Sequence, residues 1–229
     1  MKFASILFLI FLLLISPFVA VDNETHTVSS ASVNQGSNKI IIDAGLGGFD
    51  GGAVADDGTL EKNINLVIAS NLKQLCKLGG FEVIMTRDSD KGTEVDENDS
   101  ISNRKKSDMK RRLAVIEENP DAIFVSIHLN KFTTSTASGA QVFYSKNNSN
   151  SETLAENIQK SMVDLIQKEN TRTIKQADNS IFLLKKSSIP SIIIECGFLS
   201  NYEELKLLKN YEYQRKIAFA IYCGILNYY

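Results

Sequence analysis

The chain has 229 residues, of which 43% are hydrophobic, and a formal net charge of −2 at pH 7. This length and composition are sufficient for one globular domain with a substantial core. The nearly balanced charge provides no general attraction for nucleic acid, so nucleic acid is not expected as a partner.

An apolar segment begins directly after Lys2 and ends at Val21. A short basic end followed by an apolar run is the layout of an export signal. The run also approaches the ~20 residues that cross a bilayer, so residues 1–21 are predicted to be a signal peptide or a membrane anchor. Residues 22–38 are rich in Ser, Asn and Thr without periodicity and are predicted to be a linker. Both alternatives place residues 39–229 outside the cytoplasm.

Apolar periodicity divides the rest of the chain into alternating strands and helices. Short β-branched runs indicate strands, and apolar residues every three or four positions indicate helices. In chain order, the predicted elements are a strand at 39–44, a helix at 61–78, a strand at 81–86, a helix at 105–118, strands at 122–128 and 139–144, a helix at 149–169, strands at 181–184 and 191–195, and helices at 201–208 and 213–226. This alternation predicts one three-layer α/β domain, in which helices cover both faces of a largely parallel sheet of about six strands.

Local signals refine three of these segments. Ser149 and Glu152 form a capping-box pattern, which predicts the start of the third helix. Residues 87–102 are acidic and polar and are predicted to be a loop. The basic residues between 105 and 112 are predicted to form a solvated helix face, with attraction to an anionic glycan or a partner as the alternative.

The cysteines Cys76, Cys196 and Cys223 include no C-x-x-C pair. Their odd number and their spacing argue against a disulfide framework and against a thiolate zinc site. Cys76 and Cys223 lie among apolar residues in helical patterns and are predicted to fill the core. Strand alternation is expected to point Cys196 away from its neighbour Glu195.

Three polar residues mark one edge of the predicted sheet. Glu61 opens a helix, while His128 and Glu195 end strands. Because the carboxyl ends of parallel strands meet at one edge, we expect these side chains to lie close together. An imidazole and a carboxylate can hold a catalytic metal, and a second, partly buried carboxylate can act as a general base.

Each of these residues also has a structural interpretation. A histidine at a strand end is often a hydrogen-bonded structural residue, and Glu61 suits the dipole of a first helical turn. Glu195 is harder to explain in this way. An ionisable group that follows an isoleucine triplet in a central strand is costly to bury unless it is paired or functional.

Three motifs carry a resemblance to a known family. They are Asp-Ala-Gly-Leu-Gly-Gly at 43–48, Ser-Ile-His-Leu-Asn at 126–130 and Glu-Cys-Gly-Phe-Leu-Ser-Asn at 195–201. From about Lys39 to the C-terminus, the chain resembles the zinc-dependent N-acetylmuramoyl-L-alanine amidases of bacterial cell walls, the Amidase_3 family. The resemblance implies an enzyme that cleaves the amide between muramic acid and the stem peptide of peptidoglycan. It also implies that Glu61 and His128 are zinc ligands and that Glu195 is the general base, which passes a proton to the leaving amine.

One position departs from the family pattern. The family has D-A-G-H-G-G at the first motif, where the histidine binds the metal, whereas this chain has Leu46. Leucine has no lone pair, so the third ligand is missing, and the only other histidine, His26, lies in the predicted linker. Zinc binding is therefore predicted to be weak or absent, and amidase activity severely impaired. Leucine is apolar and similar in bulk, so the fold is expected to survive.

Further positions match the family less specifically. Arg104, Asn130 and Asn201 are candidate substrate-binding residues, although turn geometry would explain the asparagines equally well. Arg87 is interpreted as a structural ion pair or a substrate-side contact. Residues 139–144 and 182–186 resemble spore-cortex amidases of the CwlD type. That resemblance implies a sporulating bacterium, the space between the forespore membranes and a possible lipoprotein partner.

Three hypotheses follow from the departure at Leu46. The chain is an amidase with a disabling substitution, a non-catalytic peptidoglycan-binding or scaffolding protein with an amidase fold, or an active amidase with a rearranged metal site. A decayed enzyme should have changed at its other catalytic positions too. Because Glu61, His128 and Glu195 all match the pattern, a single isolated lesion is favoured.

Overall fold

The computed structural model describes residues 38–91 and 99–229. The predicted signal or anchor, the linker up to residue 37 with His26, and residues 92–98 of the predicted loop lie outside the described residues. The described residues belong to one compact unit. Within the described ranges, no helix combines the length and the apolar character that crossing a membrane requires.

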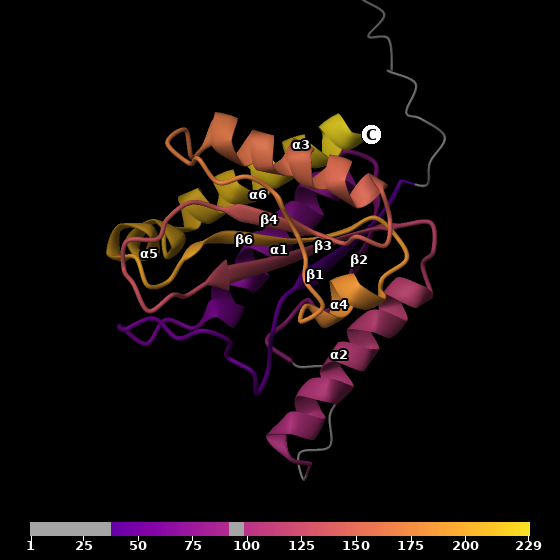
Figure 1. Ribbon diagram of the computed structural model, residues 1–229, viewed down its shortest axis with the longest axis horizontal. Helices are drawn as coiled ribbons and strands as arrows, with labels where there is room; N and C mark the ends of the chain where they lie inside the picture. The colour runs from indigo at the N-terminus through magenta and orange to yellow at the C-terminus, as the bar shows by residue number, and fades with distance from the viewer. Residues whose placement is uncertain (1–37, 92–98) are drawn as a thin grey trace, which may run out of the picture. The chain divides into compact units, whose positions relative to one another are not determined.

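A six-stranded sheet forms the centre of the unit, with the strand order β2-β1-β3-β6-β4-β5 (Figure 1). The strands are β1 (Lys39–Ala44), β2 (Glu82–Met85), β3 (Ile123–Asn130), β4 (Gln141–Tyr144), β5 (Lys175–Gln176) and β6 (Ser191–Phe198). Every neighbouring pair is parallel except β4 and β6, which are antiparallel. The predicted, largely parallel sheet is therefore confirmed.

Helices cover both faces of this sheet (Figure 1). The helices are α1 (Glu61–Leu78), α2 (Ile101–Glu117), α3 (Asn150–Leu165), α4 (Phe182–Lys186), α5 (Tyr202–Leu208) and α6 (Tyr211–Tyr228). The larger core packs one sheet face against α1, α3 and α6, and the smaller core packs the other face against α2 and α4. Ile40 and Ile42 enter the larger core and Ile41 the smaller, as the two-residue period of a strand requires. Cys76 is buried in the larger core, as predicted, whereas Cys223, also predicted to fill the core, is only partly buried. Cys196 is buried in the larger core as well.

The predicted strand at 181–184 is wrong, because this segment begins helix α4. Leu183 and Leu184 are buried, whereas Lys185 and Lys186 are exposed, and the amide of Lys185 bonds the carbonyl of Ile181 at 2.9 Å. Periodicity alone cannot distinguish a helical turn from a strand in so short an apolar run. The strand that completes the six-stranded sheet is instead β5, which consists of two exposed polar residues.

The predicted boundaries of two helices also differ from the structure. The capping box is not formed, because Ser149 makes no side-chain cap bond and Glu152 accepts a hydrogen bond from the Tyr144 hydroxyl at 2.9 Å. Ser149 is nevertheless the N-cap residue, so helix α3 begins at Asn150 as the pattern predicted, but it ends at Leu165 rather than near residue 169. Helix α2 begins at residue 101 rather than 105, after the N-cap Ser100.

Candidate active site

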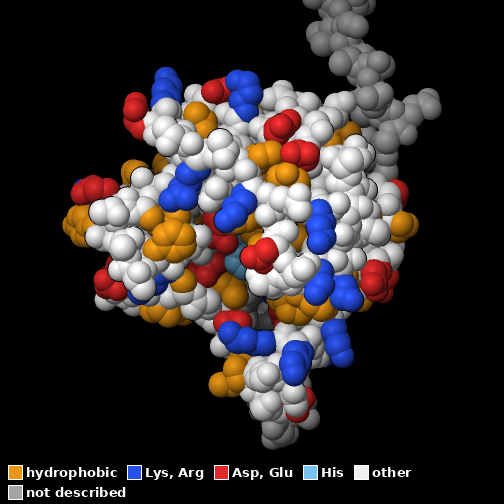
Figure 2. Space-filling view, in the orientation of Figure 1, with side chains coloured by type: hydrophobic (Ala, Val, Ile, Leu, Met, Phe, Trp, Pro, Cys, Tyr) orange, Lys and Arg blue, Asp and Glu red, His pale blue; other side chains and the backbone are white. Residues whose placement is uncertain are grey.

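The predicted site residues meet at the carboxyl edge of β1, β3 and β6. His128 on β3 is the register partner of Glu195 on β6, and Glu61 is the first residue of α1. Figure 2 shows a histidine side chain at the base of a hollow, with acidic side chains beside it. The structure therefore brings together the three side chains that sequence patterns placed at this edge.

Glu61 and His128 are in direct contact. Oε1 of Glu61 lies 2.9 Å from Nδ1 of His128 and accepts the amide of Leu129 at 3.1 Å, while Oε2 accepts the amide of Ala53 at 2.9 Å. Burial acts to raise the pKa of Glu61, but the hydrogen bond and charge of His128 outweigh it, so the pKa lies below its ordinary value. Burial acts to lower the pKa of His128, but its hydrogen bond to Glu61 and the surrounding carboxylates raise it to about 9. The two side chains form an ion pair at neutral pH.

This pair predicts a pH dependence of stability. The pKa of His128 rises from 6.5 to about 9 on folding, so its stabilisation is complete below pH 6.5 and is lost as pH increases through 9. We expect the free energy of unfolding, measured by urea denaturation across this range, to decrease with pH. The decrease should flatten in His128→Gln. An unchanged slope in that variant would contradict the assignment.

Glu195 is in a different environment from Glu61. Its Oε2 atom is buried and has no hydrogen-bond partner in the described structure. Burial raises the pKa of Glu195 to about 7, with His128 opposing the shift and Glu61 adding to it. A carboxyl group with a pKa near neutrality and an unpaired oxygen is suited to accept and return a proton.

Leu46 lies beside Glu61, in the loop that follows β1. The side chains of Leu46 and Glu61 both lie close to Gly52. A Cβ atom added to Gly52 would be 2.0 Å from Cδ1 of Leu46 and 2.6 Å from Oε2 of Glu61, so the two side chains are neighbours there. Leu46 has a φ of 67°, and among the described residues it is the only non-glycine with positive φ. This backbone conformation is unusual for leucine and several-fold more frequent for asparagine, aspartate and histidine.

Two buried arginines hold the backbone of this loop. Arg112 donates to the carbonyl of Leu46 at 2.7 Å and to that of Ala44 at 3.2 Å, and it forms a buried ion pair with Asp43. Arg87 donates to the carbonyls of Ala44 at 2.8 Å and Gly45 at 3.0 Å. The prediction that the basic residues between 105 and 112 form a solvated face is therefore wrong for Arg112, which is 2% exposed. Arg112 also forms an ion pair with Asp108, four residues before it in the same helix. This spacing was the sequence signal that could have indicated a paired rather than a solvated arginine.

The weaker candidates are placed around the same edge. The guanidinium of Arg104 lies 4.1 Å from the ring centroid of Phe49, and its Nε is buried without a partner in the described structure. Asn130 ends β3. Asn201 caps α5 through its Oδ1, which accepts the amides of Glu203 at 3.0 Å and Glu204 at 3.1 Å. Substrate contact by Arg104, Asn130 and Asn201 stays a prediction.

The residues present do not make a complete zinc site. In the part of the chain that the structure describes, no cluster of three or more His, Cys, Asp or Glu side chains is arranged to hold a metal ion. Glu61 and His128 supply two donors, and the side chain beside Glu61 is the aliphatic Leu46, which cannot be a third donor. Catalytic zinc normally takes three protein ligands, so these residues do not fit the ion.

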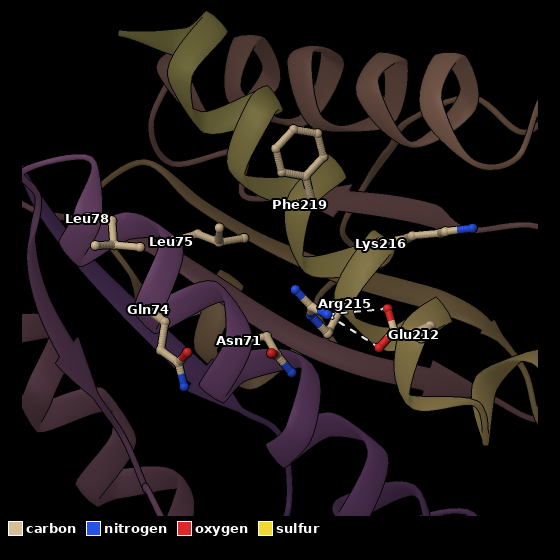
Figure 3. Close-up of a pocket in the computed structure, with 8 residues that line it drawn as sticks. All are labelled: Asn71, Gln74, Leu75, Leu78, Glu212, Arg215, Lys216 and Phe219. Atoms are coloured by element: carbon tan, nitrogen blue, oxygen red, sulfur yellow. Dashed lines mark hydrogen bonds and ion pairs between the residues drawn. The ribbon is translucent and has the colours of Figure 1, made fainter.

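A separate groove lies between α1 and α6, away from this edge (Figure 3). It has a volume of about 390 Å³, and Leu78, Glu212 and Phe219 are among the residues that line it. None of the candidate site residues contributes to its wall. The chemistry is therefore assigned to the sheet edge.

The sequence and the fold match a family of cell-wall enzymes. Residues 40–227 match the family model of N-acetylmuramoyl-L-alanine amidase. The germination-specific N-acetylmuramoyl-L-alanine amidase of Bacillus subtilis is 38% identical over 194 residues, which cover 84% of this chain and 81% of that protein. The amidase AmiA of Escherichia coli is 27% identical over 248 residues, covering 89% of this chain and 80% of that protein.

A solved structure extends the match. The CwlD amidase from Clostridioides difficile, solved in complex with the GerS lipoprotein, aligns with a TM-score of 0.80 and 44% identity. The alignment covers 83% of this chain and 97% of that one. The three-layer fold is therefore shared with a solved amidase across almost the whole of its length.

Proposed function

The chain belongs to the N-acetylmuramoyl-L-alanine amidase family, and on that premise we propose that it is a peptidoglycan amidase whose hydrolytic step is disabled at Leu46. The observation that carries this proposal is the aliphatic side chain of Leu46 beside Glu61, at the position where the family has a histidine that binds zinc. Glu61, His128 and Glu195 remain in an enzyme-like arrangement. The reaction lost is cleavage of the amide between muramic acid and the stem peptide.

Each retained side chain has a role in this proposal. Glu61 and His128 would hold zinc together with a third ligand, and the ion would supply Lewis acidity for amide hydrolysis. Glu195 would move the proton, because its buried and unpaired oxygen favours a pKa near neutrality. Arg112 and Arg87 would keep the loop of residue 46 in place.

The relatives support a place of action and a partner for this chain. Amidases of the cell wall act outside the cytoplasm, and residues 1–21 would supply the export signal or anchor. The 44% identity to an amidase solved with a lipoprotein supports a sporulation lipoprotein as the partner of this chain. Similarity to a germination-specific amidase supports the spore cortex as the substrate and the space between the forespore membranes as the location.

A second candidate is a non-catalytic peptidoglycan-binding or scaffolding protein with the same fold. The absence of a metal ligand at Leu46 favours this candidate, because a protein can bind peptidoglycan without a metal. The retained Glu195 disfavours it, because a buried carboxyl oxygen without a hydrogen-bond partner is destabilising and serves no purpose in a scaffold.

Zinc content tests the proposal directly. We expect the purified protein to contain well under one zinc per chain after dialysis and to release little or no stem peptide from peptidoglycan. Its thermal transition should be insensitive to a chelator, because no bound metal stabilises the native state. Equimolar zinc in elemental analysis, or a chelator that lowers the midpoint by many degrees, would instead support a rearranged metal site.

A further inference from the structure

Arg172 places a cation next to the catalytic edge of the sheet. Its Nε donates to the carbonyl of Ser138 at 2.7 Å, and its Nη1 donates to Oε1 of Gln141 at 3.2 Å. Gln141 on β4 is the register partner of Glu195 on β6, and these strands are antiparallel. Directly opposed residues of antiparallel strands project from the same face and lie close together. Arg172 is therefore hydrogen-bonded to Gln141, the residue that lies opposite Glu195 in the sheet.

Aromatic packing fixes the orientation of this guanidinium. Its Cζ atom lies 4.6 Å from the ring centroid of Phe198, which in turn contacts the ring of Phe132 at 4.9 Å between centroids. Phe198 is buried, whereas Phe132 is 47% exposed. Stacking on an aromatic face holds the planar fork in place, so little side-chain entropy remains to be lost when a ligand binds.

The charge of Arg172 is not neutralised by an ion pair within the described residues. Both of its hydrogen-bond acceptors are neutral oxygens, and its Nη2 has no partner there. The nearby carboxylate of Glu204 accepts the amides of Gly139 and Phe198, each at 2.8 Å, and it interacts with Arg172 through its charge without forming a hydrogen bond to it. A pre-oriented guanidinium with free donors is best matched by a carboxylate, which it can bind through two parallel hydrogen bonds.

Space for a ligand exists beside this side chain. A hollow of about 350 Å³ is lined by Ser138, Asn170, Arg172 and Glu169, among others. Glu169 is exposed, so solvent and salt screen its charge. The half-buried guanidinium is held by the protein and is the stronger determinant of which ligand charge is accepted.

We propose that Arg172 is a specificity-determining residue that binds a free carboxylate of the stem peptide, beside the amide bond that Glu195 faces. This inference rests on the proposed function. The carboxyl group of muramic acid is consumed in the amide bond, so the free carboxylates near that bond belong to the peptide. The first of them along the peptide is the α-carboxyl of its second residue, D-glutamate.

Binding to the protein as it exists tests the subsite without any need for zinc. The probes are N-acetylmuramoyl-L-alanyl-D-glutamate and N-acetylmuramoyl-L-alanyl-D-isoglutamine, which differ in whether that α-carboxyl is free or amidated. We expect calorimetric titration to show about tenfold tighter binding of the free acid, the usual order for a hydrogen bond to a charged group. Arg172→Gln should remove this preference, and Arg172→Lys should keep part of it.

A matched control separates this contact from general electrostatics. Lys175→Gln removes one positive charge from the exposed strand β5 nearby and should leave the preference unchanged. Thermal unfolding of each variant shows whether the fold is intact. Equal affinity of the two probes for the parent protein, or no binding of either at millimolar concentration, would overturn the proposal.

A kinetic measurement separates this inference from the proposed function. In a Leu46→His background, Arg172→Gln should raise KM for the free-acid probe about tenfold and leave kcat within about twofold. A purely structural role would lower kcat as well. If Leu46→His is inactive while the parent protein still prefers the free acid, the proposed function fails and the subsite stands.

Discussion

Leu46→His is expected to bind one equivalent of zinc and to release stem peptide from peptidoglycan. The imidazole would join Glu61 and His128, which already lie in contact at 2.9 Å, and complete a set of three protein ligands. Elemental analysis after dialysis and a chromatographic assay of released peptide measure the two results. Both should be lost on addition of a chelator.

The backbone at residue 46 supports this expectation. Its left-handed conformation, with φ at 67°, is one that histidine adopts more readily than leucine. The carbonyl of the same residue is held by Arg112 at 2.7 Å, and that of Gly45 by Arg87 at 3.0 Å. Because the loop is held by contacts that do not involve the side chain of residue 46, substitution there should leave its position unchanged.

Glu195→Gln in the same background separates the ligands from the proton carrier. The amide has nearly the shape of the carboxyl group but cannot accept a proton, so peptide release should fall by at least about a hundredfold. Zinc content should remain equimolar, since Glu195 is not among the three ligands. If Leu46→His binds equimolar zinc yet stays inert with its partner supplied, the lesion is not isolated, and the scaffolding function is favoured.

Arg112→Leu is expected to lower the free energy of unfolding by about 3–5 kcal/mol, because it leaves Asp43 charged and buried without its ion-pair partner. Asp43 is 1% exposed and would keep only its bonds from the Ser126 and Thr86 hydroxyls, both at 2.6 Å. Urea denaturation measures the loss.

Arg111→Leu is the matched control for this substitution. It removes the same side chain at the adjacent position, which is exposed, and should change stability by less than about 0.5 kcal/mol. Equal losses in the two variants would show that the pair with Asp43 contributes nothing specific. In the Leu46→His background, loss of zinc in Arg112→Leu, but not in Arg111→Leu, would show that this arginine also positions the loop.

Sequence patterns were sufficient for the parts of the fold that bury continuous apolar runs. The isoleucines of β1 and β6 predicted central strands, and the periodicity of α1 predicted both of its ends. The edge of the sheet was not predictable in this way. β5 has two exposed polar residues and no alternation, while the apolar run that suggested a strand at 181–184 forms the buried side of a short helix.

The same limit applies to the site. The rule that parallel strands end at one edge was enough to bring His128 and Glu195 together, and the first turn of α1 added Glu61. Arg112 and Arg172 were missed because both act on oxygens supplied by distant segments. Arg112 bonds the carbonyl of Leu46, and Arg172 bonds Gln141 and Ser138. The i,i+4 spacing from Asp108 could have signalled an ion pair for Arg112, but no local pattern signals the distant oxygens that the two arginines bond. Only tertiary structure reveals those contacts.

The left-handed backbone at Leu46 also affects how easily leucine and histidine can be exchanged at this position by mutation. The leucine codons CUU and CUC differ from the histidine codons CAU and CAC only at the middle base. Where either leucine codon encodes this position, one transversion exchanges the two residues, and the backbone already suits the incoming imidazole. No compensating substitution is then required in either direction. The proposed loss of hydrolysis at this residue would then be genetically reversible by one point mutation.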